Sequence, residues 1–460
     1  MSSSAASAQP VGVSIQAARN VQPAWIGHLL PLLMLLGSVT LPVLGKSFFL
    51  PLYLPFIYFG LLTRRIAISS WRVPRQDFYV GLYCLTALCS IGYVTDLPKY
   101  AYGAFSLFLI GIPAYALGRR LARSTHWRPD ALIYAFVGAA ALMSLLYLYK
   151  LAVDPVGFRV AFVYKLTSVA GMRSNTLVSF HIFGLVATLE LLRNARRGRV
   201  QLLLLALLLI DIAGGIAFNS RIYMILMCVL FAIYLAGGSR RSTWYLRLLV
   251  VAIAVALIVR PPEGLVRTVI HRWTSHAAAR QAGQVDPRLQ IWQRSLEVWL
   301  ERPLFGHGLT NSFLGASFLW RLVHDRATLA EIANMPEGVL NYRSDGYFMA
   351  HNTILQLLIE VGLVGATLFL ILFARVVRHL NRLRRSDSPE TRMLARVFLL
   401  ALGLAFADGM IENNFLTRDF GALYWFVIGV SYSLYQVNVA NAASANHSVP
   451  PVASPGPAPA

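Results

Sequence analysis

The chain has 460 residues, of which 57% are hydrophobic and 13% carry a charged side chain. Soluble domains contain roughly 45–50% apolar and about 25% charged residues, so this composition excludes a soluble globular domain and indicates an integral membrane protein. The formal net charge is +21. Because the basic residues stand in short clusters between apolar runs, as in membrane proteins, we expect membrane lipids and no nucleic acid among the partners.

Apolar stretches close to the roughly 20 residues that a helix needs to cross a bilayer recur along the chain. They predict an all-α polytopic fold with about twelve transmembrane helices. The predicted spans are residues 24–44, 47–63, 78–95, 100–118, 131–149, 174–192, 200–218, 222–237, 244–259, 350–374, 393–413 and 420–437.

The predicted organisation has five parts. They are a disordered tail at 1–22, spans one to nine within 23–259, a long loop at 260–349, spans ten to twelve within 350–438, and a disordered tail at 439–460. The first tail lacks the features of a signal peptide, and the last is rich in proline and alanine. Arginine clusters follow every even-numbered span through the tenth, which places these loops and both tails in the cytoplasm.

The loop 260–349 is much longer than the other connections, and such loops are usually functional or disordered. Asp286 followed by Pro287 is typical of a helix start. Apolar residues then recur at helical spacing, namely Leu289, Trp292, Leu296 and Trp299. The pattern predicts an amphipathic helix that ends near Pro303 and lies on the membrane surface or over a cavity.

His351 and Asn352 stand where the tenth span begins, and they are the first candidates for chemistry. We expect His351 in the first turn of that helix, where the positive end of the helix dipole favours a neutral imidazole that can accept a proton. His351 is therefore a candidate general base, and Asn352 could orient it or donate to a substrate oxygen. The alternative is an interfacial histidine that only caps the helix. Glu360 is about half a turn out of phase with His351 on the predicted helix, so we do not expect Glu360 to orient the His351 side chain.

Two arginines are candidates for binding an anion. Arg221 follows Asn219 and Ser220 in a tight outer turn, and Arg288 lies in the first turn of the predicted loop helix. Helix N-termini and arginine side chains both bind phosphate well. The alternatives are an arginine that reaches to the membrane interface and a solvated surface charge. Further outer residues could also contribute to substrate binding, and the sequence does not rank them, namely Arg159, Lys165, Arg173, His324 and Arg343.

Asp211 and Asp408 fall inside predicted spans and must face the helix bundle, because a carboxylate is costly in lipid. The sequence contains no Walker loop, no HExxH motif and no paired outer carboxylates, so ATP use and a catalytic metal are not expected.

The order of these motifs resembles the O-antigen ligase/polymerase superfamily of bacterial membrane glycosyltransferases. The resemblance rests on NSR before one span, DPRLQIW and RPLFGHGL in the long loop, and HN with EVGLVG in the next span. It is best over residues 205–370, and the twelve spans with a long loop between spans nine and ten are most similar to the ligase.

The resemblance implies transfer of O-antigen from undecaprenyl diphosphate to lipid A-core at the periplasmic face of the inner membrane, without a cofactor. It assigns His351 as the base and Arg221 and Arg288 as diphosphate ligands, with Asn352, Asn219 and Ser220 in supporting positions. O-antigen polymerases and protein O-oligosaccharyltransferases share the superfamily. A transporter of lipid-linked sugars is the remaining alternative, although such carriers usually show internal repeats.

Overall fold

The structure is a computed structural model of the chain. It describes residues 75–93, 97–123, 128–153, 168–169, 172–217, 221–237, 247, 287–309, 350–411 and 418–447. The α-helices there are α3 (Arg75–Cys89), α4 (Leu97–Phe105), α5 (Ile112–Leu121), α6 (Pro129–Val153), α8 (Ser174–Asn194), α9 (Gly198–Ala217), α10 (Arg221–Gly237), α13 (Pro287–Glu301), α17 (Thr353–Leu383), α18 (Pro389–Gly409) and α19 (Arg418–His447). A 3-10 helix, η3 (Ser90–Tyr93), follows α3, and a π-helix, η4 (Ser106–Gly111), joins α4 to α5. A short antiparallel pair, β1 (Ser168–Val169) and β2 (Met172–Arg173), precedes α8.

The described part of the chain is helical and consistent with an all-α membrane protein. Nine of the predicted spans coincide with helices of the structure, and α13 occupies the predicted loop helix. Within the described ranges, four helical stretches are long and apolar enough to cross a bilayer, namely Gly103–Leu121, Pro129–Tyr149, Gly198–Gly215 and Thr353–Leu383. The spans at 24–44 and 47–63, and 244–259 apart from Arg247, lie outside the described residues, so the number twelve stays a prediction.

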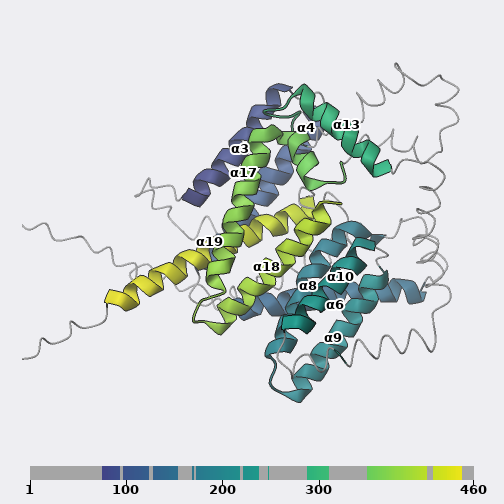
Figure 1. The fold of residues 1–460 in the computed structure, drawn as a ribbon, viewed down its shortest axis with the longest axis vertical. Helices are drawn as coiled ribbons and strands as arrows, with labels where there is room; N and C mark the ends of the chain where they lie inside the picture. The colour runs from purple at the N-terminus through teal and green to yellow at the C-terminus, as the bar shows by residue number, and fades with distance from the viewer. Residues whose placement is uncertain are drawn as a thin grey trace, which may run out of the picture.

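Helix α18 lies between two groups of helices (Figure 1). One group contains α6, α8, α9 and α10, and the other contains α3, α13 and α17. Helix α18 packs against α6 and α8 on one side and against α17 on the other. Phe398 of α18 meets Phe136 and Phe183 edge-on in the first of these contacts, at centroid distances of 6.1 and 6.3 Å.

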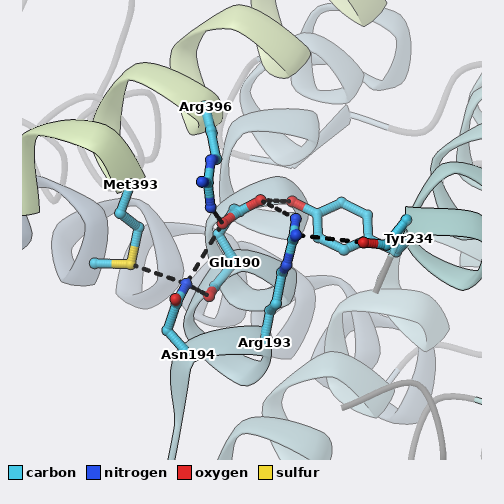
Figure 2. A network of polar contacts seen from close by, with 7 residues as sticks. Glu190, Arg193, Asn194, Tyr234, Met393 and Arg396 are labelled. Carbon is cyan, nitrogen blue, oxygen red and sulfur yellow. Dashed lines mark hydrogen bonds and ion pairs between the residues drawn. The ribbon is translucent and has the colours of Figure 1, made fainter. Parts of the chain in front are cut away.

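Glu190 joins three helices at one end of the bundle (Figure 2). Its carboxylate, in α8, accepts a hydrogen bond of 2.9 Å from the hydroxyl of Tyr234 in α10. The carboxylate also pairs with Arg193, at 3.7 Å, and with Arg396 of α18, at 3.8 Å. Because Glu190 is buried, its charge needs these partners, and the cluster therefore fixes the relative heights of α8, α10 and α18.

Helices α8 and α18 run antiparallel. The amide of Asn194 lies 3.7 Å from the sulfur of Met393 at the Glu190 end (Figure 2). Phe183, earlier in α8, instead meets Phe398, which is later in α18. Residue numbers therefore fall along α8 as they rise along α18, which puts the first turn of α8 level with the last turn of α18.

Helix α10 runs in the same direction as α8. The hydroxyl of Tyr223 lies 2.6 Å from Nδ1 of His181, and Tyr234, three turns later, bonds to Glu190. Arg221, the first residue of α10, therefore lies at the same end of the bundle as the last turn of α18.

Candidate functional site

His351 lies in a strained turn immediately before α17. Its φ is 48°, the one positive value among the non-glycine residues that the structure describes. The helix begins at Thr353, with Asn352 as its N-cap. The prediction that His351 belongs to the first helical turn is therefore wrong. Since a non-glycine residue in this conformation costs about 1–3 kcal/mol, its surroundings must hold it there.

Asn352 stabilises this conformation of the turn through three hydrogen bonds. Its Oδ1 accepts hydrogen bonds from the backbone N–H groups of Ile354, at 2.9 Å, and Leu355, at 3.1 Å. Its Nδ2 donates to the carbonyl of Met410, just after the end of α18, at 3.0 Å. Both ends of the Asn352 amide thus bind protein atoms, and the side chain ties the His351 turn to α18.

Gln356 and Glu360 support the other side of the same turn, a role that was not predicted from the sequence. The Gln356 Oε1 accepts a bond of 2.9 Å from the backbone N–H of Ala350, and its Nε2 donates to Glu360 Oε1 at 2.6 Å. All three residues are buried. Glu360 is therefore linked to the backbone beside His351 through Gln356, and the spacing of four between Gln356 and Glu360 was the available sign.

Replacing Asn352 tests how this turn is held. Loss of an N-cap costs about 0.5–2 kcal/mol, so we expect Asn352→Ala to lower the thermal unfolding temperature and to reduce activity. Asn352→Asp retains an acceptor for Ile354 and Leu355 but not the donor to Met410, so it should keep more of the stability than alanine does. Thermal unfolding of the purified protein measures both changes. An alanine variant as stable as the original protein would show that the cap does not hold the turn.

Helix α17 is broken at Gly362, and a turn of the long loop fills the break. Gly362 has φ 66° and ψ −172°, so the helical hydrogen bonds cannot continue across it. The carbonyls of Ile359 and Glu360 instead accept from the N–H groups of His307, at 2.7 Å, and Gly308, at 2.9 Å. Unpaired backbone groups cost several kcal/mol in a membrane, and this pairing removes part of that cost.

Backbone N–H groups that follow the break at Gly362 also bond to the turn of the long loop. The N–H groups of Leu363 and Val364 donate to the carbonyls of Pro303, at 2.8 Å, and Leu304, at 3.2 Å. We call residues 303–308 together with the break at Gly362 the loop–helix junction. The turn that follows α13 is thus built into α17.

His307 and the α13–α17 contact fix the loop helix beside the His351 turn. Nε2 of the buried His307 lies 2.8 Å from the carbonyl of Val298 in α13, and burial lowers the pKa of His307 below its usual range. The neutral ring therefore donates to Val298. Val298 packs with Ala350 and Ile359, so α13 lies against the start of α17.

The two arginines are placed by these helices. Arg288 is in the first turn of α13, three residues before Ile291, which packs against the cluster that contains Ala350. Arg221 begins α10 at the end of the bundle where Asn352 binds Met410.

The remaining predicted residues divide into two sets. Asp211 and Asp408 are buried, as predicted, and Arg173 lies in β2 directly before α8. The positions outside the described residues are Asn219, Ser220, Arg159, Lys165, His324 and Arg343.

Comparison with known proteins identifies a family domain within this region. Residues 205–370 match the family model described as O-Antigen ligase. The match begins in α9 and ends in α17, so it includes Arg221, Arg288, the loop–helix junction and His351. A search of curated proteins gives no match.

Proposed function

We propose, for a chain that belongs to the O-antigen ligase/polymerase superfamily, that it is an O-antigen ligase. In this proposal it transfers O-antigen polysaccharide from undecaprenyl diphosphate to lipid A-core. The family supports a general enzymatic role on lipid-linked polysaccharides. The observation that supports His351 and Arg221 as the site is the His351 turn, which is held in a strained conformation by three polar side chains, at the same end of the bundle as Arg221. The long loop between predicted spans nine and ten favours the ligase over the other activities of the superfamily.

The proposal places the His351 end at the periplasmic surface of the inner membrane. The opposite end supports this orientation, because the α8–α9 and α17–α18 connections there are basic, and basic loops stay in the cytoplasm. The arginines in these connections and in the adjoining helix ends are Arg193, Arg196, Arg197, Arg199, Arg382, Arg384, Arg385 and Arg392.

In the proposed reaction, Arg221 and Arg288 bind the donor diphosphate and neutralise its charge. Diphosphate is then a good leaving group, and the reaction needs no metal for this purpose. His351 removes the proton of an acceptor hydroxyl as that oxygen attacks the anomeric carbon of the donor. The bond from this carbon to the phosphate oxygen breaks, undecaprenyl diphosphate leaves, and the single displacement inverts the anomeric configuration.

Lysine at either arginine position tests the diphosphate role. Charge-assisted hydrogen bonds contribute about 1.5–3 kcal/mol, and lysine lacks the forked geometry of arginine. We therefore expect Arg221→Lys and Arg288→Lys each to lower kcat/KM for the lipid-linked donor by about tenfold or more. Transfer by the purified protein to lipid A-core, measured over a range of donor concentrations, gives these values.

Arg196→Lys, at an exposed position on the opposite end of the bundle, is the matched control and should leave kcat/KM unchanged. Full activity in Arg221→Lys would mean that only a positive charge matters at this position. Extension of the donor by further repeat units, with no transfer to lipid A-core, would instead identify a polymerase.

A further inference from the structure

A chain of buried polar side chains crosses four helices close to Arg221. The Tyr223 hydroxyl of α10 lies 2.6 Å from Nδ1 of His181 in α8, and Nε2 of the same ring lies 2.8 Å from Oγ of Ser144 in α6. Ser144 donates to Oδ1 of Asp211 in α9 at 3.4 Å. All four side chains are fully buried. We call them the Tyr223–Asp211 chain.

The hydrogen bonds of this chain have one direction. Ser144 has a single hydroxyl proton, which it gives to Asp211, so it accepts from Nε2–H of His181. Nδ1 of the neutral His181 then accepts the proton of the Tyr223 hydroxyl. Each donor along the chain points toward the carboxylate. The Thr188 hydroxyl lies 3.5 Å from Asp211 Oδ2, but its single proton goes to the Gly184 carbonyl at 2.9 Å.

The backbone of α9 is fitted to this chain. A Cβ on Gly215 would lie 2.2 Å from a ring carbon of Tyr223, and a Cβ on Gly214 would lie 2.5 Å from the Cβ of Ser144. The adjacent glycines therefore leave room for both side chains. Burying polar side chains among membrane helices costs more free energy than burying apolar ones. Hydrogen bonds are directional, however, so they fix the rotation and the height of one helix against another more closely than apolar contacts do.

We infer that the Tyr223–Asp211 chain is a positioning device for Arg221, and this inference rests on the diphosphate role given to Arg221 above. Tyr223 lies two residues after Arg221, within the first turn of α10. Its bond to His181 fixes the rotation of that turn about the helix axis and its height against α8. The direction of the Cα–Cβ bond of Arg221 is thereby set by the backbone of this turn. Tyr223 itself touches no substrate.

Tyr223→Phe is the first test, because it removes the hydroxyl and keeps the ring. The probe is undecaprenyl diphosphate, and its affinity for the full chain is measured in lipid nanodiscs together with thermal unfolding. Loss of one hydrogen bond that orients a ligand-binding group should weaken binding by about three- to tenfold. Ser144→Ala breaks the chain one link further away and should weaken binding in the same direction.

Tyr234→Phe is the matched control. It removes a buried tyrosine hydroxyl from the same helix at the opposite end, where the hydroxyl binds Glu190 at 2.9 Å. If the chain acts only on stability, both tyrosine variants should change unfolding and neither should change affinity. We expect both variants to lower thermal stability and Tyr223→Phe alone to weaken binding.

A double-mutant cycle separates this inference from the proposed function. Arg221→Gln should weaken binding, and adding Tyr223→Phe to it should have no further effect, because the tyrosine acts through the arginine. Additive effects, or unchanged affinity in Tyr223→Phe while Arg221→Gln binds weakly, would overturn the inference and leave the diphosphate role intact. Unchanged affinity in Arg221→Gln would overturn both.

Discussion

Replacing His351 with alanine is expected to lower glycosyl transfer by about 10²–10⁴-fold, the range that a general base contributes. The proposed step needs an acceptor for the proton of the attacking hydroxyl, and alanine provides none. Donor affinity should change little, because the diphosphate is assigned to Arg221 and Arg288. Single-turnover transfer by the purified protein, together with the affinity for undecaprenyl diphosphate, measures both quantities.

His351→Asn tests whether the loss of activity comes from a disrupted turn or from the missing base. Asparagine tolerates positive φ better than most residues, so it should retain the turn whose φ is 48° but cannot act as a base. We expect both variants to unfold near the temperature of the original protein and both to be inactive. Near-normal turnover in either folded variant would remove His351 from the catalytic role.

Gly362→Ala is expected to have the largest effect on the fold. A Cβ at this position would lie 2.2 Å from the carbonyl oxygen of Leu304, and the φ of 66° with ψ near 180° is a conformation restricted almost to glycine. Straightening α17 would relieve this strain, but it would expel residues 303–308 and leave their backbone groups without the partners in α17. We therefore expect little folded protein in size-exclusion profiles and no transfer activity.

Gly403→Ala in α18 is the control for Gly362→Ala. Nothing lies within 4 Å of a Cβ built at Gly403, and alanine is more favourable than glycine in a helix by about 0.5–1 kcal/mol. This variant should fold at least as well as the original protein. A well-folded and active Gly362→Ala would mean that the loop–helix junction is not needed to place α13 beside α17.

The amino-acid sequence was sufficient for features that depend on local patterns. Pro287 after Asp286 and the helical spacing of apolar residues located α13, which begins at Pro287. The apolar runs located nine helical stretches within the described residues, and the motif order indicated the family that the 205–370 match supports. Each of these features is set by residues close together in the chain.

The features that were missed depend on contacts between distant segments. Gly362 reads as an ordinary residue of an apolar helix, and only the turn at 303–308 shows why the helix breaks there. His351 lies outside the helix because Asn352 caps it, and the Asn352 bond to Met410 joins residues 58 positions apart. The Tyr223–Asp211 chain likewise takes one residue from each of four helices, so no sequence window contains it.

A lipopolysaccharide gel from the native host lacking this gene, complemented with the original sequence or with His351→Ala, tests whether the protein is a ligase that uses His351 as its base. We expect the deletion to remove all O-antigen from lipid A-core while polymer accumulates on undecaprenyl diphosphate, and only the original sequence to restore transfer. Lipopolysaccharide with a single repeat unit on its core would contradict ligation and indicate polymerisation. Restoration by His351→Ala would contradict the proposed base.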